Sequence, residues 1–255
     1  IAGLHCPMGC AGAGAVFQVG WRSMQRVVEE VDEQRLGVRP DYLFDAAAWP
    51  RQLGAADAGR GATAFVGDTS GDYALRTYRR GGAMASLLGD RYLFTGASRV
   101  RSLVEYRLLK DMYESGLPVP APAAARCERE GLFYRAWLVT ALIPETKTLT
   151  EALARSELAE DAWGALGDTL ARFHRAGIDH PDLNANNILL QDGGQWFLLD
   201  FDRGRKRSPG SWSSGNLKRL YRSLLKERTV SGATHWDERH WHALASGYRS
   251  AYRSG

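Results

Sequence analysis

Two neighbouring stretches decide the fold of this 255-residue chain: His180-Pro181-Asp182-Leu183-Asn184-Ala185-Asn186-Asn187-Ile188-Leu189-Leu190 and Leu198-Leu199-Asp200-Phe201-Asp202. Asp182 and Asn187 lie on one irregular loop, and a predicted hairpin brings Asp200 back beside them. Phosphoryl transfer uses a carboxylate to orient the attacking hydroxyl and oxygen ligands to bind Mg²⁺. We therefore predict Asp182 as the catalytic residue and Asn187 and Asp200 as Mg²⁺ ligands. The alternative is that all three only cap loops or helices; their order after a strong helical pattern favours the catalytic interpretation.

The spacing resembles the catalytic loop H-x-D-x-x-x-x-N of protein-kinase-like enzymes, which is followed by a D-F-G-like element. Three positions depart from the protein-kinase pattern. Pro181 replaces an arginine, Asn184 replaces a lysine, and Asp202 replaces the glycine of D-F-G. These departures disfavour a protein as the substrate.

The elements expected along the chain form a two-lobed α+β layout, with strands before residue 144 and helices after it. We predict strands at 62–67, 72–79 and 133–143, a helix at 100–115, a connector at 117–122, a helix at 157–176, the hairpin 188–199, and helices at 216–228 and 236–253. The resulting division is a tail at 1–39, poorly ordered at 1–23, an N-terminal lobe at 40–143 and a C-terminal lobe at 144–255.

A second motif precedes the first predicted strand. The stretch Gly59-Arg60-Gly61-Ala62-Thr63-Ala64-Phe65-Val66 resembles a glycine-rich loop over ATP phosphates, whose backbone N–H groups bind the phosphate oxygens. Arg76 stands where such enzymes carry a phosphate-contacting lysine, and Glu105 is its expected ion-pair partner. The alternative for Glu105 is a solvated helix face. We predict that the nucleotide is bound by Gly59, Arg60, Gly61, Val66, Arg76 and Glu105.

The charge is uneven along the chain. Residues 203–228 hold nine Lys and Arg against one acid, a net charge of +8, so the rest of the chain carries −4 of the overall +4. This segment predicts an anionic partner, which Arg203, Arg205, Lys206 and Arg207 would contact because they follow the metal-binding triplet directly. It lacks a nucleic-acid-binding motif, so no nucleic acid is expected.

Other features exclude broad classes. No run of about 18 apolar residues is present, so no membrane-spanning helix is expected. The N-terminus lacks the pattern of a secretory signal, and three cysteines in 255 residues fit a reducing compartment better than a disulfide framework.

The motifs resemble one family in particular, the lipopolysaccharide core kinases, and within it the kinases of 3-deoxy-D-manno-octulosonic acid (Kdo). The resemblance covers about 40–254 and rests on Gly59-Arg60-Gly61, Leu75-Arg76-Thr77-Tyr78-Arg79-Arg80-Gly81-Gly82, Gly116-Leu117-Pro118-Val119-Pro120, the loop 180–189 and Asp200-Phe201-Asp202-Arg203-Gly204. It implies a bilobal protein-kinase-like fold and Mg–ATP-dependent phosphorylation of a Kdo hydroxyl, the 4-hydroxyl, on a lipid A precursor. It also implies a peripheral enzyme at the cytoplasmic side of a Gram-negative inner membrane, in contact with its anionic surface.

Other functions stay open on the residues alone. These are a kinase for a heptose or another small molecule, a nucleotide-binding pseudokinase scaffold, and a basic nucleic-acid-binding protein.

Overall fold

The computed structural model of the protein describes residues 20–22, 25–37, 39–58, 61–78, 92–231 and 235–253. Gly59 and Arg60 of the predicted phosphate loop lie outside the described residues. The same holds for the stretch 79–91, with its Arg-Arg-Gly-Gly motif, and for most of the predicted tail.

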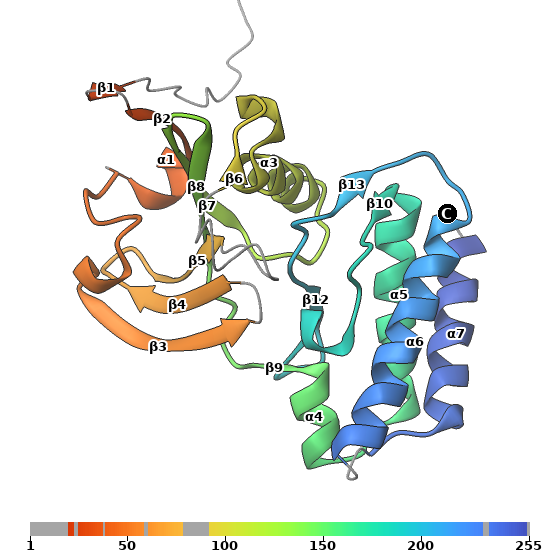
Figure 1. Ribbon diagram of the computed structural model, residues 1–255. Helices are drawn as coiled ribbons and strands as arrows, with labels where there is room; N and C mark the ends of the chain where they lie inside the picture. The colour runs from red at the N-terminus through yellow and green to blue at the C-terminus, as the bar shows by residue number, and fades with distance from the viewer. Residues whose placement is uncertain are drawn as a thin grey trace, which may run out of the picture.

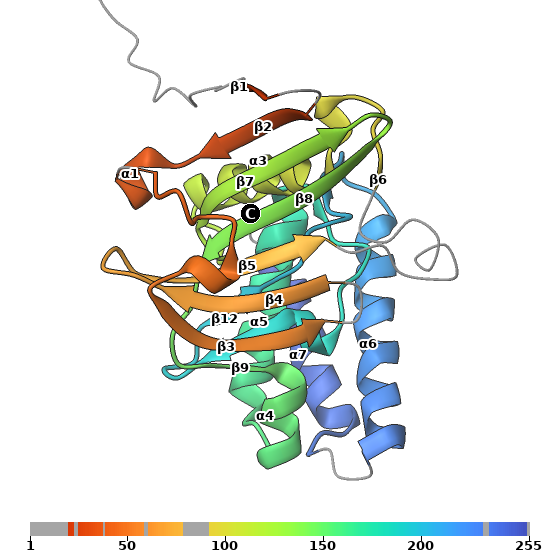
Figure 2. The same ribbon diagram turned by 60° about the vertical axis from the view of Figure 1, so that its left-hand side comes forward.

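The N-terminal half is built on one antiparallel sheet of eight strands (Figures 1 and 2). Its path is β1-β2-β7-β8-β5-β4-β3, and β6 pairs with β8. Figure 2 shows these strands side by side, with helix α3 (Arg101–Glu114) behind β7 and β8. The strands are β1 (Gly20–Arg22), β2 (Gln25–Val31), β3 (Arg51–Ala58), β4 (Gly61–Gly67), β5 (Asp72–Tyr78), β6 (Tyr92–Leu93), β7 (Pro122–Glu130) and β8 (Phe133–Ala141).

Strand β5 separates two hydrophobic clusters because successive side chains point to opposite faces of a sheet. Tyr73 and Leu75 pack with Trp49 in a cluster confined to the N-terminal half. Tyr78 belongs to the larger cluster, which includes α3 and the C-terminal helices. Arg76 lies on the Tyr78 side of the strand, so the period of two turns its guanidinium toward α3.

In the described part of the C-terminal half, four helices lie beside two small sheets (Figure 1). Strands β9 (Thr146–Thr148), β11 (Ile188–Gln191) and β12 (Trp196–Leu198) form one sheet, and β10 (Ile178–Asp179) pairs with β13 (Arg205–Lys206). The helices are α4 (Leu149–Arg155), α5 (Glu160–Arg175), α6 (Trp212–Ser231) and α7 (Glu238–Arg253). Within the described ranges, no helix is long and apolar enough to cross a bilayer.

Helices α5 and α7 approach closely because each carries a glycine at the crossing. A Cβ on Gly167 would collide with the backbone carbonyl of Leu244, and one on Gly247 with the carbonyl of Gly164. Any side chain at these two positions would push the helices apart, so the glycines set the spacing of the helical layer.

The α+β class and the order of strands before helices are confirmed. The helix predicted at 157–176 is α5, the predicted hairpin is β11–β12, and the two closing helices are α6 and α7. The strands predicted at 62–67, 72–79 and 133–143 are β4, β5 and β8, and the helix at 100–115 is α3.

The sequence analysis placed no element before residue 59, whereas the structure has β1, β2, the short helix α1 (Glu33–Leu36) and β3 there. Residues 20–22 and 25–36 therefore belong to the fold rather than to a tail. Two features of the sequence explain why these elements were not predicted. The buried Glu30 of β2 interrupts the apolar pattern and is paired with Arg107 of α3. Strand β3 is rich in Ala, Gly and Asp, which have low strand propensity.

Candidate active site

The loop that carries Asp182 is fixed by the buried His180. Its Nε2 lies 2.9 Å from the carbonyl oxygen of Leu199, and its backbone N–H donates to Asn216 Oδ1 over 2.9 Å. Burial lowers the pKa of His180, so the ring is neutral at neutral pH, and Nε2 carries the proton because a carbonyl can only accept. His180 thereby joins the Asp182 loop to the residue that precedes Asp200.

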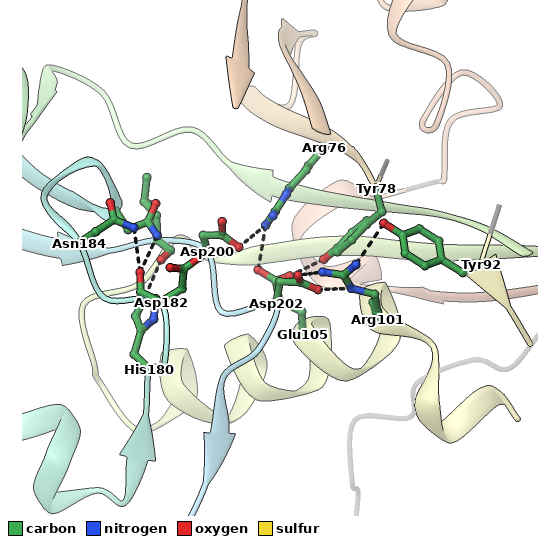
Figure 3. A network of polar contacts seen from close by, with 12 residues as sticks. Arg76, Tyr78, Tyr92, Arg101, Glu105, His180, Asp182, Asn184, Asp200 and Asp202 are labelled. Carbon is green, nitrogen blue, oxygen red and sulfur yellow. Dashed lines mark hydrogen bonds and ion pairs between the residues drawn. The ribbon is translucent and has the colours of Figure 1, made fainter. Parts of the chain in front are cut away.

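Two asparagines close this loop around one backbone oxygen. Asn184 Nδ2 donates to the carbonyl of Asp182 over 2.8 Å, and Asn187 Nδ2 donates to the same oxygen over 3.1 Å (Figure 3). With its amide nitrogen committed to the loop, Asn187 has its amide oxygen left to act as a metal ligand.

Asp200 has an unusual backbone conformation and a charged partner from the other half of the chain. Its φ is +60°, in the left-handed region that residues other than glycine seldom adopt and that is found more often at functional sites. Its Oδ1 accepts a hydrogen bond of 2.8 Å from Arg76 Nη1. The same nitrogen lies 3.4 Å from Glu105 Oε1, so Arg76 joins the two acids (Figure 3).

Glu105 is almost fully buried, its side chain only 2% exposed. It accepts a hydrogen bond from the Tyr78 hydroxyl as well as from Arg76. Burial raises the pKa of Glu105, although Arg76 and this hydrogen bond act in the opposite direction. For Arg76, burial disfavours the charge, but Glu105 and Asp200 outweigh it and raise its pKa. The geometry excludes a solvated helix face for Glu105 and gives Arg76 the expected partner.

A second contact joins the halves through Asp202. Arg101 Nε donates to Asp202 Oδ1 over 2.5 Å, and Arg101 Nη1 donates to the Tyr92 hydroxyl over 3.1 Å (Figure 3). The guanidinium also lies 5.8 Å from the centre of the Tyr78 ring. Sequence reasoning noticed Asp202 only as a departure from D-F-G and did not single out Arg101. The acid at position 202, where the D-F-G motif has glycine, was the sequence signal that could have indicated this contact.

The predicted nucleotide contacts lie in two different places. Gly61 begins β4 opposite Tyr78, next to the Arg76 region. Val66 pairs with Tyr73 and packs in the cluster on the other face of the sheet. Its side chain therefore lies on the face of the sheet opposite Arg76, and its part in nucleotide binding stays a prediction.

The predicted acceptor contacts also divide. Arg205 Nε and Arg207 Nη1 donate to the buried Asp179 over 3.1 and 3.0 Å, and Asn216 Nδ2 donates to its other oxygen over 3.0 Å. Burial opposes ionisation of Asp179, but these hydrogen bonds outweigh it and lower the pKa. All four basic residues are exposed, but Arg205 and Arg207 are paired with Asp179, 62% and 42% of their side chains remaining exposed.

The donors near Asp182 fit a hard cation. Among the residues that the structure describes, no three His, Cys, Asp or Glu side chains cluster as a complete metal site. Mg²⁺ is commonly bound through one or two protein side chains together with substrate phosphates, so Asp200 and Asn187 could hold it in this way.

Comparison with known proteins gives the family. The model of the lipopolysaccharide kinase (Kdo/WaaP) family matches residues 47–248. The chain belongs to this family. The match to the Kdo/WaaP family includes Arg76, Glu105, the loop 180–190 and Asp200.

Several named proteins are similar to the chain in sequence. A protein of Xanthomonas oryzae pv. oryzae (strain PXO99A) named 3-deoxy-D-manno-octulosonic acid kinase is 46% identical over 201 residues, 77% of this chain and 80% of the relative. Proteins of the same name from Xanthomonas axonopodis pv. citri (strain 306) and Xylella fastidiosa (strain 9a5c) are 46% and 44% identical over 199 residues, with the same coverage.

Proposed function

We propose that the chain is a Kdo kinase, which transfers the γ-phosphate of ATP to a hydroxyl of Kdo, the 4-hydroxyl, on a lipid A precursor. The names of its relatives, at 44–46% identity, support this acceptor. Membership of a kinase family supports ATP as the donor.

One observation carries the proposal. Arg76 Nη1 lies 2.8 Å from Asp200 and 3.4 Å from Glu105, so a cation from the sheet meets an acid from the loop region at the boundary of the two halves. In protein kinases a cation of the sheet pairs with an acid of the following helix beside the D-F-G aspartate, and Arg76, Glu105 and Asp200 have this arrangement. We assign β1, β2 and α1 to the N-terminal lobe together with 40–143, and 144–255 to the C-terminal lobe.

The roles of the chain's own residues follow from their positions. Asp182 accepts a hydrogen bond from the attacking hydroxyl and orients it. Arg76, held by Glu105, contacts the phosphates, and the backbone at Gly59, Arg60 and Gly61 covers them.

Asp200 and Asn187 would hold Mg²⁺. When bound, this ion neutralises charge on the phosphate oxygens. Most of the rate gain would come from such positioning and charge neutralisation.

The proposed acceptor indicates the cellular location of the enzyme. A lipid A precursor is a membrane glycolipid, so we propose that the chain acts as a peripheral protein at the cytoplasmic face of the inner membrane. The net charge of +8 in residues 203–228 supports contact with an anionic surface.

The test is a phosphotransfer assay with ATP and four acceptors: Kdo-lipid A, a heptosylated lipopolysaccharide core, kanamycin and a generic protein. We expect phosphate on Kdo-lipid A. Phosphate on the heptosylated acceptor alone would replace the proposal by a heptose kinase, and ATP binding without transfer to any acceptor would favour a pseudokinase.

The Asp182→Ala variant tests the assigned role. We expect its turnover to fall by about a hundredfold or more, because a positioned base contributes that much to such reactions. ATP binding and thermal unfolding should stay near those of the wild type, since Asp182 is 40% exposed. Near-normal turnover would remove Asp182 from the mechanism.

A further inference from the structure

Helix α6 is fastened to the Asp182 loop along one face. The side chain of Asn216 bonds to His180 and Asp179, Arg219 Nη2 donates to Asp182 Oδ1, and Ser223 Oγ accepts from the N–H of Ala185 over 3.2 Å. Residues 216, 219 and 223 are spaced by about one and two helical turns, so they share one face of the helix. Leu220 and Leu224 are fully buried beside this face. The helix is therefore placed firmly relative to Asp182.

A pocket of about 400 Å³ opens where the helix and the loop meet. Its wall on the loop side is Asn184 and Asn186, the second and fourth residues after Asp182. Its wall on the helix side is Arg219, Arg222, Ser223, Lys226 and Glu227. Because Arg219 contacts Asp182 directly, the α6 pocket adjoins the predicted catalytic carboxylate.

The lining of the α6 pocket is cationic. Three of its residues are basic and one, Glu227, is acidic. Arg219 is already paired with Asp182. Arg222 and Lys226 are exposed, and neither has an ion pair within the described part of the chain. Arg222 and Lys226 thus place two positive charges on the concave surface against the one carboxylate of Glu227.

This combination of shape, charge and position favours an anionic ligand. Basic side chains on a convex helix face are normally solvated, whereas here they line a hollow of a size that suits a sugar. Arginine forms paired hydrogen bonds with carboxylate and phosphate oxygens. A ligand held here has its neighbouring atoms within reach of Asp182.

We propose that the α6 pocket binds an anionic group of the acceptor and so positions the hydroxyl at Asp182, an inference that rests on the proposed function. The anion is a carboxylate or a phosphate: Kdo carries the first and lipid A the second. Arg222 and Lys226 are the binding residues, and Arg219 links the pocket to the catalytic carboxylate.

Steady-state kinetics with Kdo-lipid A test the α6 pocket. We expect Arg222→Gln and Lys226→Gln each to raise the KM for the acceptor by about tenfold, the loss of one charge-assisted contact, while the KM for ATP and kcat change little. Lys218→Gln is the matched control, because it removes the same charge from the same helix outside the pocket lining. We expect it to change the acceptor KM by less than about twofold.

Modified acceptors distinguish the two sources of the anion. If the pocket holds the carboxylate, the Kdo methyl ester is a poor acceptor for the wild type, and Arg222→Gln causes no further loss with it. If the pocket holds a phosphate, the acceptor with dephosphorylated lipid A is the poor acceptor for the wild type instead, and Arg222→Gln causes no further loss with it. The inference is overturned if Arg222→Gln and Lys226→Gln match Lys218→Gln, or if their effect persists on an acceptor that lacks both groups.

Equilibrium binding of Kdo-lipid A without ATP separates this inference from the proposed function. If the wild type binds Kdo-lipid A but transfers no phosphate to it, the proposed function is contradicted. Weaker binding by Arg222→Gln would still support the α6 pocket as the anion-binding site. If the wild type transfers phosphate but Arg222→Gln and Lys226→Gln bind Kdo-lipid A as the wild type does, only the inference about the α6 pocket is contradicted.

Discussion

Two ion pairs at the site lie in opposite surroundings. The Arg76 and Glu105 side chains are 22% and 2% exposed, and the Tyr78 hydroxyl occupies the second oxygen of Glu105. The Arg219 and Asp182 side chains are 46% and 40% exposed. A buried, hydrogen-bonded pair keeps one geometry, whereas an exposed pair is screened by water and exchanges partners readily. The pair on the proposed nucleotide side therefore keeps one geometry before any ligand arrives, whereas the Arg219–Asp182 pair on the acceptor side can exchange partners.

The largest effect on the free energy of unfolding is expected at the buried pair. We expect Glu105→Ala to lower the free energy of unfolding by about 3 kcal/mol, because it leaves Arg76 and the Tyr78 hydroxyl short of a buried partner. Urea denaturation of this variant and of Glu114→Ala provides the measurement. Glu114 lies on the same helix, is 63% exposed and faces Lys110 at 3.9 Å, so its loss should be about 0.5 kcal/mol or less. Equal losses in the two variants would contradict the buried environment of Glu105.

A second test concerns the support beneath α6. His174 of α5 lies 2.9 Å from the Tyr248 hydroxyl and packs edge-on against Trp212, the first residue of α6. Burial lowers its pKa from 6.5 to about 4, although Asn216 and Asp179 favour the charged form. Above pH 6.5 the ring is neutral in both states. Below it the unfolded chain binds a proton first, so stability is lost as the pH falls toward 4.

The expected loss from His174 between pH 7 and pH 4.5 is about 2 kcal/mol. The measurement is the free energy of unfolding of the wild type and of His174→Phe at both pH values. Phenylalanine keeps the ring contacts but does not titrate, so the variant should lose less stability than the wild type. Parallel losses would mean that His174 is not protected from protonation.

The smallest effect is expected at the exposed pair. Arg219→Gln should lower the free energy of unfolding by less than about 1 kcal/mol, and 1 M NaCl should reduce the effect further. Urea denaturation at low and high salt gives the comparison with Glu105→Ala. A loss as large as that of Glu105→Ala would show that both pairs support the fold equally and would remove the distinction between the two pairs.

Local patterns carried most of the sequence-based prediction. Strands β4 and β5, helices α3, α5, α6 and α7 and the β11–β12 hairpin follow from apolar period and turn residues within short windows. The pairing of Arg76 with Glu105 came from a motif whose spacing this family shares with other kinases. Asp182, Asn187 and Asp200 were identified by the same means, and their catalytic and metal-binding roles stay predictions.

The remaining contacts depend on residues far apart in the chain. Arg101 and Asp202 are 101 positions apart, and Asn216 meets Asp179 across 37 positions. No window in the sequence contains both partners of such a pair. The contacts of Arg205 and Arg207 with Asp179 could not be predicted for a further reason: a cluster of basic residues indicates charge but not which acid each side chain meets, and the β10–β13 pairing sets Arg205 opposite Asp179.

The three attachments of α6 have a consequence for how this region can change. Turning the helix by one residue rotates its faces by about 100°, which would detach Asn216, Arg219 and Ser223 together. A one-residue insertion or deletion between positions 216 and 223 would rotate one part of the helix relative to the other, so the three contacts could not all form. A single substitution of one of these residues would remove one contact only. The length of this short segment is consequently more constrained than its composition.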